Sequence, residues 1–277
     1  MQSLCTITSN VEVSPSIHLM WLEAPDVAAT AQPGQFITVR CKDLTLRRPL
    51  SIHQVVVASE TKQSQVALLF KVVGKGTLWL SQLQIGDKID ILGPLGKGFS
   101  IPSVTARCPE CKRRNMPRQS RNLLLVAGGI GIAPLAFWAQ RASSQHSLTL
   151  IHGASTAAQL YEQPLPPKVQ FIPVTEDGTM GRKAMVTDIL PDFLPWADQV
   201  YACGPIEMYK AMAKMSLRAK RSNLKIKKCQ VSLEVRMGCG IGACYGCTIN
   251  TKKGLKQVCR DGPIFELEDI IWEEVRV

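Results

Sequence analysis

Four cysteines near the C-terminus constrain this chain of 277 residues more than any other feature. Three lie in the run Cys239-Gly-Ile-Gly-Ala-Cys244-Tyr-Gly-Cys247 and Cys259 follows, so the spacing is C-x4-C-x2-C-x11-C. A C-x4-C-x2-C run with a distant fourth cysteine is typical of plant-type [2Fe–2S] sites. Glycines at 240, 242 and 246 would permit left-handed backbone angles and leave N–H groups free to donate to sulfur. We therefore predict that these four thiolates hold a [2Fe–2S] cluster.

Zinc is the main alternative for the same thiols, because four cysteines can bind one zinc ion tetrahedrally. Zinc sites usually combine two C-x2-C pairs, whereas this run holds one such pair after a four-residue gap, which favours iron–sulfur. A separate pair, Cys108 and Cys111, has no two further ligands nearby in the sequence, and we interpret it as a bystander. We expect Cys5, Cys41 and Cys229 to be small buried apolar residues.

The net charge of +11 at first suggests nucleic acid or anionic lipid as a partner. Segment 106–121 carries six Lys/Arg and one Glu, and segment 218–228 carries six Lys/Arg, so the two account for the whole charge. We interpret both as solvated insertions, with RNA binding as a weaker alternative. The sequence shows neither a signal peptide nor an apolar run near the roughly 18 to 20 residues of a membrane helix, so we expect a cytoplasmic chain with reduced thiols.

The pattern of apolar runs divides the chain into three zones and predicts an α+β multidomain fold. Residues 1–100 contain short apolar runs between Gly, Pro and Asp, which predicts an antiparallel β-barrel. Residues 122–217 alternate strands with helices, which predicts a Rossmann-like α/β domain with a parallel sheet. Residues 229–277 form a small cysteine-rich module that would gain stability from a metal centre. The basic insertions, 101–121 and 218–228, separate these zones.

Two short motifs in the first zone predict a flavin site when they are taken together. Arg48-Pro49-Leu50-Ser51 follows one expected strand, and Gly74-Lys75-Gly76-Thr77 follows another. Arg48 would neutralise a pyrophosphate and Ser51 would face the isoalloxazine, while Gly76 and Thr77 would donate to phosphate. Each motif alone could be an ordinary surface turn or hairpin.

A Gly-rich turn in the second zone predicts a nucleotide site. It lies between an expected strand and helix, where a pyrophosphate can bind at a helix N-terminus, although it lacks the G-x-G-x-x-G pattern and could be a turn without a ligand. Segment 153–159 holds no Arg or Lys for a 2′-phosphate, which favours NAD over NADP. The candidate residues at this turn and at two later strand ends are Gly128, Gly129, Gly131, Pro134, Glu176, Asp177, Cys203, Gly204 and Pro205.

This order of zones and motifs resembles the ferredoxin–NADP⁺ reductase superfamily and, more closely, the electron-transfer subunits of NAD-linked bacterial dihydroorotate dehydrogenases. The most specific parts are segments 232–247 and 258–263, whereas the two basic insertions depart from the family pattern. The resemblance implies the cluster ligands Cys239, Cys244, Cys247 and Cys259. It implies FAD contacts at Arg48, Pro49, Leu50, Ser51, Leu69, Phe70, Lys71, Gly76 and Thr77.

The same resemblance implies a role in electron transfer during pyrimidine biosynthesis. Each chain would hold one FAD and one [2Fe–2S] cluster, and would pass electrons from the FMN of a catalytic partner subunit to NAD⁺ in an assembly with two copies of each. Because cofactors carry this chemistry, we expect no side-chain catalytic residue, and we interpret the four histidines as ordinary surface or core residues. The alternatives are a related subunit of a hydrogenase, sulfide dehydrogenase or transhydrogenase and, more remotely, a zinc and RNA-binding protein.

Overall fold

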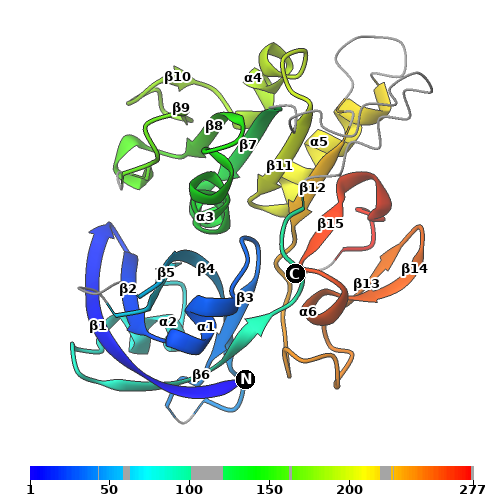
Figure 1. Cartoon of the computed structure of the whole chain (residues 1–277). Helices are drawn as coiled ribbons and strands as arrows, with labels where there is room; N and C mark the ends of the chain where they lie inside the picture. The colour runs from blue at the N-terminus through cyan, green and yellow to red at the C-terminus, as the bar shows by residue number, and fades with distance from the viewer. Residues whose placement is uncertain are drawn as a thin grey trace, which may run out of the picture.

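The computed structural model divides into a barrel, a parallel sheet and a cysteine-rich module (Figure 1). Most of the two basic insertions, together with Cys108 and Cys111, lies outside the described residues. None of the helices in the described ranges is long and apolar enough to cross a membrane. The structure describes residues 1–42, 44–58, 63–100, 121–161, 164–218, 226 and 228–275.

The N-terminal barrel closes on itself, so every strand edge is paired. Its strands follow the order β1-β2-β5-β4-β3-β6 and all pairs are antiparallel. Alternating side chains point inward and fill an apolar core, which α1 (Pro25–Thr30) and α2 (Lys75–Ser81) accompany. The strands are β1 (Gln2–Ser14), β2 (Ile17–Glu23), β3 (Phe36–Val39), β4 (Arg48–Val56), β5 (Gln65–Lys71) and β6 (Lys88–Leu95).

A seven-stranded sheet follows the barrel, in the order β10-β9-β8-β7-β11-β12-β15. The central strands β7 and β11 are buried along almost their whole length, because α3 (Ile132–Ala142), α4 (Val186–Phe193) and α5 (Ile206–Arg218) accompany the sheet. Every neighbouring pair is parallel except β12 with β15. The strands are β7 (Asn122–Gly128), β8 (Ser147–Ala154), β9 (Val169–Thr175), β10 (Arg182–Lys183), β11 (Gln199–Cys203), β12 (Cys229–Ser232) and β15 (Ile264–Glu266).

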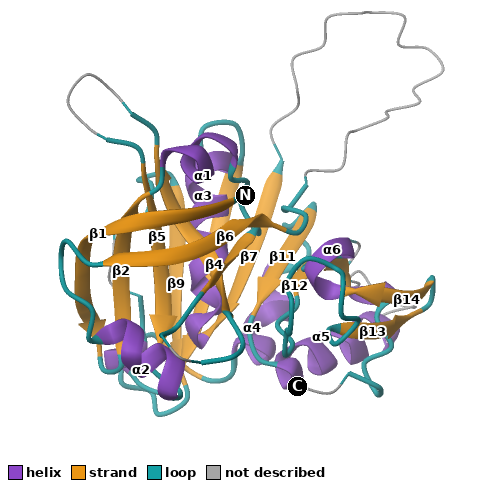
Figure 2. Cartoon of the chain, turned by 90° about the horizontal axis from the view of Figure 1, so that it is seen from below, coloured by secondary structure: helices purple, strands orange, loops and turns teal. Residues whose placement is uncertain are grey.

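The cysteine-rich module is joined to both larger parts (Figure 2). Two of its strands, β12 and β15, extend the parallel sheet, while β13 (Thr248–Thr251) and β14 (Gly254–Gln257) form a separate hairpin before α6 (Val258–Asp261). On the barrel side, the Lys97 N–H donates to the Gly262 carbonyl at 2.6 Å. The predicted combination of a barrel, a parallel sheet and a C-terminal module is therefore confirmed, with the module built into the sheet.

Two buried histidines lie where the barrel meets the sheet. His53 of β4 bonds the Ala133 carbonyl through Nδ1 and the Tyr161 hydroxyl through Nε2, each at 3.0 Å. His152 of β8 bonds the Gly129 carbonyl through Nε2 at 3.0 Å and the Tyr161 N–H through Nδ1 at 3.2 Å. Burial lowers the pKa of each ring from 6.5 to about 4. The hydrogen bond to the backbone carbonyl raises the pKa, but by less than burial lowers it. Both rings are therefore neutral at physiological pH.

These two rings predict a loss of stability on mild acidification. In the unfolded chain each histidine takes up a proton near pH 6.5, whereas the folded rings resist protonation down to about pH 4. Stability from the neutral rings is therefore complete above pH 6.5 and is lost as the pH falls toward 4, by roughly 3 kcal/mol per ring in total.

We expect the free energy of urea unfolding to fall between pH 6.5 and pH 5, where Asp and Glu titrate little. In His53→Gln the free energy of unfolding should change less steeply with pH, because one of the two buried rings no longer titrates. A free energy of unfolding that stays constant over this interval in the unmodified chain would contradict the assignment of both rings as buried and neutral.

Candidate redox site

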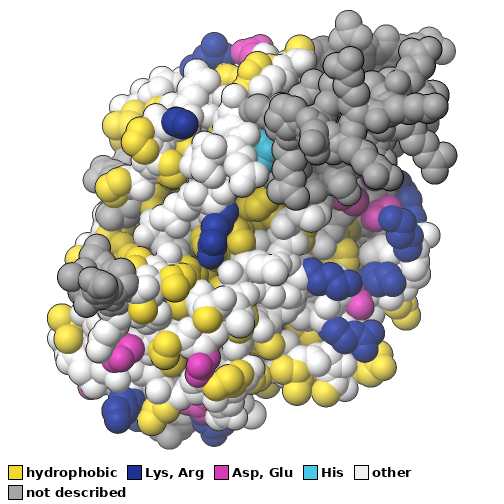
Figure 3. Space-filling model, viewed as in Figure 1, with side chains coloured by type: hydrophobic (Ala, Val, Ile, Leu, Met, Phe, Trp, Pro, Cys, Tyr) yellow, Lys and Arg dark blue, Asp and Glu magenta, His cyan; other side chains and the backbone are white. Residues whose placement is uncertain are grey.

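A cavity of about 620 Å³ lies between the barrel, the start of α3 and the segment that follows β12. Figure 3 shows the hollow between barrel and sheet, with hydrophobic side chains on its floor. Eight of the nine residues predicted to contact FAD line this cavity, and Gly76 packs directly behind Arg48. A Cβ on Gly76 would come 2.8 Å from Arg48 Nε, so a side chain at this position would push the Arg48 side chain aside. The eight lining residues are Arg48, Pro49, Leu50, Ser51, Leu69, Phe70, Lys71 and Thr77.

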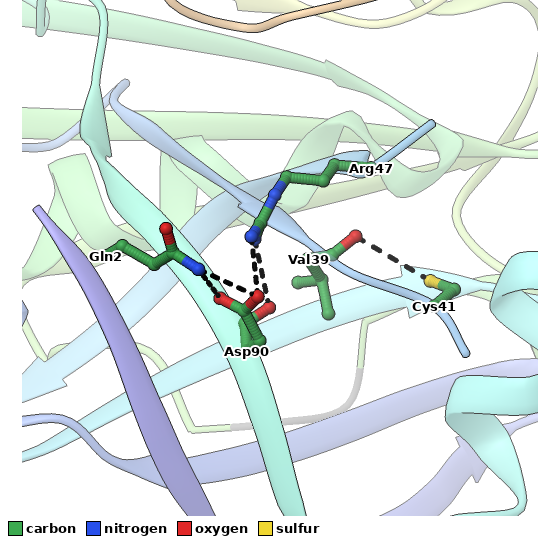
Figure 4. Close-up of polar contacts among 5 residues, drawn as sticks. All are labelled: Gln2, Val39, Cys41, Arg47 and Asp90. Atoms are coloured by element: carbon green, nitrogen blue, oxygen red, sulfur yellow. Dashed lines mark hydrogen bonds and ion pairs between the residues drawn. The ribbon is translucent and has the colours of Figure 1, made fainter. Parts of the chain in front are cut away.

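Two neighbouring arginines line the cavity but have different partners. The Arg47 guanidinium forms an ion pair with Asp90 of β6 at 2.6 Å, and Gln2 of β1 donates to the same carboxylate (Figure 4). Arg48 donates to the Leu46 carbonyl at 2.7 Å and has no carboxylate partner among the described residues. Of these two arginines, Arg48 is therefore the one available to a pyrophosphate, whereas Arg47 ties the start of β4 to β6.

The Thr77 hydroxyl is already engaged by the backbone at the start of α2. It accepts from the N–H groups of Val73 at 2.9 Å and Gly74 at 3.2 Å, and it lies 3.1 Å from the Gly74 carbonyl. These contacts satisfy backbone groups at the N-terminus of the helix. The predicted hydroxyl contact to phosphate therefore competes with this cap, and the backbone N–H groups of Lys75 and Gly76, at the start of α2, are the freer donors.

Sequence reasoning missed the segment 232–237, which forms one wall of the cavity. It belongs to the cysteine-rich module, about 160 residues beyond the flavin motifs, so no local pattern connected the two. Glu234 is the one carboxylate among the residues that line the cavity, and burial among protein atoms raises the pKa of its side chain. The Glu234 side chain is nevertheless accessible to solvent, because it faces the open cavity. A ligand in the cavity would cover this side chain.

The four predicted cysteine ligands lie together in the loop after this segment. Backbone N–H groups point at all four sulfurs and make seven contacts, with N···S distances of 3.1 to 3.5 Å. Such donors stabilise thiolates and tune the potential of a metal centre that they surround. The loop therefore fits an iron–sulfur cluster. The N–H donors are those of Cys239, Ile241, Gly242, Ala243, Cys244, Gly246 and Cys259.

The thiols are arranged in two pairs, Cys239 with Cys244 and Cys247 with Cys259. Within the described ranges, no three His, Cys, Asp or Glu side chains converge to hold a single metal ion. Four thiolates in two pairs are the ligand set of a binuclear cluster. Burial raises the pKa of the Cys259 thiol, so a metal would have to displace its proton.

The thiol of Cys239 differs from the buried pair. Its slight burial works to raise its pKa, but the N–H groups of Ile241, Cys244 and Ala243 outweigh this and lower it to about 6. Their donated hydrogen bonds favour the charged sulfur over the neutral thiol. At physiological pH this sulfur is therefore largely thiolate, the form that binds metal.

The backbone of the loop differs from the expectation at one glycine. Gly240 and Gly242 have φ of +75° and +86°, as predicted, but the third positive angle belongs to Tyr245, with φ of +60°, and not to Gly246. Gly246 serves instead by its N–H, which donates to Cys244 Sγ at 3.5 Å. Gly240 also permits close packing, since a Cβ there would lie 2.8 Å from Thr38 Cγ2 on barrel strand β3.

The two thiol pairs face in different directions. Cys244 is exposed and Cys239 is partly exposed, whereas Cys247 and Cys259 are buried. The buried pair belongs to the same apolar cluster as Phe36, which also lines the flavin cavity. A cluster held here would have one edge toward solvent and the other toward the flavin cavity.

The predicted nucleotide turn lies where the strand order of the sheet reverses, between β7 and β11. Ligands of open α/β sheets bind at such a switch point, beyond the carboxyl ends of the strands. A Cβ on Gly131 would come 2.1 Å from the Cys203 carbonyl oxygen, and one on Gly128 would come 2.7 Å from Pro205 Cδ. The structure therefore brings these two glycines, Cys203, Gly204 and Pro205 together.

The remaining nucleotide candidates occupy other positions. Gly129 adopts φ of +53° within the turn, and Pro134 is buried in the first turn of α3. Glu176 and Asp177 follow β9, two strands away from β7, where Glu176 accepts from the Ser155 hydroxyl at 3.2 Å. Glu176 and Asp177 lie beyond the end of β8. In dinucleotide-binding sheets, the adenosine ribose is recognised on this side of the switch point.

Cys203 is buried at the end of β11 and does not line the flavin cavity. Burial raises its pKa far above the ordinary value, so its thiol stays neutral. The neighbouring Gly204 N–H donates to the Tyr209 hydroxyl at 2.9 Å, and that hydroxyl donates to the Ser232 carbonyl at 2.6 Å. Because Ser232 lines the cavity, Tyr209 connects the nucleotide turn to the flavin wall.

Three protein-family models match successive parts of this chain. An oxidoreductase FAD-binding domain matches residues 4–99, and an oxidoreductase NAD-binding domain matches residues 125–214. The iron–sulfur cluster binding domain of dihydroorotate dehydrogenase B matches residues 234–271. The predicted cofactors, FAD, an iron–sulfur cluster and NAD, are confirmed at this level.

Curated relatives match the chain over nearly its whole length. The electron transfer subunit of dihydroorotate dehydrogenase B (NAD(+)) from Desulforamulus reducens is 36% identical, over 94% of this chain and 95% of its own. The protein of the same name from Shouchella clausii is 33% identical, over 98% of each.

Two solved structures support the same fold. A chain in the structure of an NADH-dependent reduced ferredoxin–NADP oxidoreductase has a TM-score of 0.78 at 28% identity, covering 98% of this chain and 91% of that one. A ferredoxin NADP⁺ reductase from Neisseria gonorrhoeae has a TM-score of 0.59 at 17% identity, covering 82% and 92%, and shows the fold alone.

The contact between Gly131 and β11 predicts a selective defect in nucleotide binding. In Gly131→Ala the new methyl group would overlap the Cys203 carbonyl, so the turn must move away from the end of β11. We expect the Kd for NADH to rise about tenfold or more, on the scale seen when a binding group is misplaced by about 1 Å. Cluster absorbance should stay normal, because the cysteine loop lies elsewhere; unchanged NADH affinity would contradict the assignment of this turn.

Proposed function

The chain belongs to the family of electron transfer subunits of NAD(+)-dependent dihydroorotate dehydrogenase B, and from this premise we propose how its residues connect a catalytic partner to NAD⁺. FAD occupies the cavity behind Arg48, NAD⁺ approaches through the Gly128–Gly131 turn, and a [2Fe–2S] cluster is held by the four cysteines. When bound, these groups convert single-electron transfer into hydride transfer, so that electrons from dihydroorotate oxidation reach NAD⁺. This activity belongs to pyrimidine biosynthesis.

The observation that carries the proposal is the placement of the cysteine loop between solvent and the flavin cavity. Cys244 lies at the surface, and Cys247 and Cys259 share an apolar cluster with Phe36 of the cavity wall. The segment 232–237 runs from the cavity directly into the cysteine loop. A cluster held by these cysteines would therefore lie between the surface at Cys244 and the packed protein that borders the flavin cavity.

The residues of the chain do not react but hold and isolate the groups that do. Arg48 supplies positive charge for a pyrophosphate, and the apolar side chains of Leu50, Leu69 and Phe70 exclude water from the cavity. Seven N–H contacts stabilise the thiolates that hold the metal. We therefore propose no side-chain catalytic residue, since the cofactors carry the chemistry.

Exposed apolar side chains mark the surface that we assign to the partner. Ile241 and Tyr245 flank the outer thiols and are 55% and 68% exposed. Large apolar groups at such a position favour a protein interface, which would also cover the cluster edge. We propose that the catalytic subunit docks here with an FMN of its own and that the assembly holds two of each chain. We also place the assembly in the cytoplasm, where the four described cysteines outside the loop would stay as free thiols.

Reconstitution with a dihydroorotate dehydrogenase catalytic subunit tests the proposal. We expect the mixture to reduce NAD⁺ with dihydroorotate, and the isolated chain to oxidise NADH with artificial dyes. Cys244→Ser should abolish the first activity and keep the second, because it removes a cluster ligand while leaving the flavin cavity intact. The matched control, Cys229→Ala, changes a buried cysteine outside the loop and should keep both activities.

Two outcomes would overturn the proposal. Loss of FAD together with retained iron in Cys244→Ser would show that this cysteine serves the flavin and not the cluster. Electron transfer to ferredoxin, but not to or from the dihydroorotate dehydrogenase subunit, would favour the related reductase class in its place.

The docking surface predicts a separate defect in association. Ile241→Asp places a charge in the middle of the proposed interface, so we expect the Kd for the catalytic subunit to rise at least tenfold, while the cluster and dye activity are retained. Leu255→Asp is the matched control, since Leu255 is 68% exposed on β14 and away from the thiols. Equal affinities of both variants, measured by titration calorimetry, would contradict this placement of the interface.

A further inference from the structure

The buried network of His53, Tyr161 and His152 has a unique arrangement of protons. His53 Nδ1 faces the Ala133 carbonyl, which can only accept, so a neutral ring must carry its proton on Nδ1. His53 Nε2 is then an acceptor, and the Tyr161 hydroxyl must donate to it. His152 must carry its proton on Nε2, which faces the Gly129 carbonyl, and its Nδ1 accepts from the Tyr161 N–H. Each member thus has a fixed role as donor and acceptor.

The Tyr161 hydroxyl is satisfied from both sides. It donates to His53, and the Gln54 side chain donates to it at 3.3 Å. Both His53 and Gln54 belong to β4, the strand whose first residues line the flavin cavity. Tyr161 therefore contacts both parts of the molecule. Its hydroxyl bonds the barrel strand, and its backbone N–H bonds His152 of β8 in the sheet.

The network ends on two carbonyls, one inside the nucleotide turn and one just after it. Gly129 lies inside the turn with φ of +53°, and Ala133 lies in the first turn of α3. Ala133 also lines the flavin cavity, as does Ile130 between the two. The rings therefore contact the short stretch of backbone on which the nucleotide and the flavin sites meet.

We propose that His53, Tyr161 and His152 are positioning residues that fix the nucleotide turn against the flavin strand and so set the approach of the nicotinamide to the flavin. This inference rests on the proposed function, in which the turn binds NAD⁺. It assigns the network a role beyond stability, because hydride transfer depends on reactants held at close range and in alignment. A displacement of Gly129 relative to β4 would alter that alignment without removing any contact to either cofactor site.

The alternative is that the two histidines are merely satisfied core residues. A matched pair of tyrosine variants separates the two interpretations. Tyr161→Phe removes the hydroxyl that holds His53. Tyr201→Phe removes the hydroxyl of another buried tyrosine, whose bond goes to the Ser100 carbonyl at 3.0 Å and not to the turn. Tyr161→Phe loses the bonds to His53 and Gln54, and Tyr201→Phe loses the bond to Ser100, so both should lose some stability and Tyr161→Phe the more.

The experiment uses the full chain with its cofactors and needs no partner subunit. Three readouts are compared for both variants: amide hydrogen exchange at residues 129–132, the Kd for NADH, and the rate at which NADH reduces the flavin in single turnover. For Tyr161→Phe we expect faster exchange at the turn, a Kd raised about five- to tenfold and slower flavin reduction at saturating NADH, the scale of one lost buried hydrogen bond. FAD content, cluster absorbance and the values of Tyr201→Phe should stay normal.

Conservative variants of His53 add a test by rescue. The amide oxygen of Gln can replace Nε2 as the acceptor for Tyr161, whereas Ala replaces neither nitrogen. His53→Gln should therefore retain more of the NADH affinity than His53→Ala. The proposal is overturned if Tyr161→Phe lowers the melting temperature but matches Tyr201→Phe in exchange, in Kd and in the reduction rate. Because all readouts are taken on the isolated chain, this failure is distinct from a failure to couple to the dihydroorotate dehydrogenase subunit.

Discussion

Hydrogen bonds from backbone N–H groups to the four cysteine sulfurs are the interaction on which this molecule depends. A loop can present four thiolates to a metal only if their charge is stabilised, and the seven contacts supply that stabilisation from the chain itself. They require an irregular backbone, which Gly240, Gly242 and Tyr245 provide through positive φ angles. The remaining structure holds this loop in place, with Thr38 of the barrel packed against Gly240.

The cysteine loop has one side toward solvent and the other toward the flavin cavity. Its outer thiols meet solvent beside Ile241 and Tyr245, and its inner thiols meet the apolar cluster that reaches Phe36 and the flavin cavity. On the far side of the cavity, the nucleotide turn is joined to the barrel through Tyr161 and to the cavity wall through Tyr209. Each of the three sites thus contacts the next through packed side chains, and each redox group can be held without a reactive residue of the protein.

The sequence predicted those features that depend on short segments. The four cysteines are close in sequence, so their spacing alone indicated the cluster, and the flavin motif lies on one strand, so Arg48 to Ser51 were found together. The wall formed by 232–237 and the bonds of His53 depend on packing between distant segments, which periodicity does not encode. The left-handed residue Tyr245 was missed because glycine is the usual residue at such angles, and Gly246 beside it was the simpler expectation.

The most direct test of the central claim is the metal content of the purified chain, measured together with its visible spectrum. We predict iron and acid-labile sulfide in equal amounts, about two of each per chain, with cluster absorbance added to that of FAD. Both should be lost in Cys244→Ser without loss of FAD. A single zinc or iron ion per chain, without sulfide, would contradict the account, because the two thiol pairs would then serve a mononuclear site.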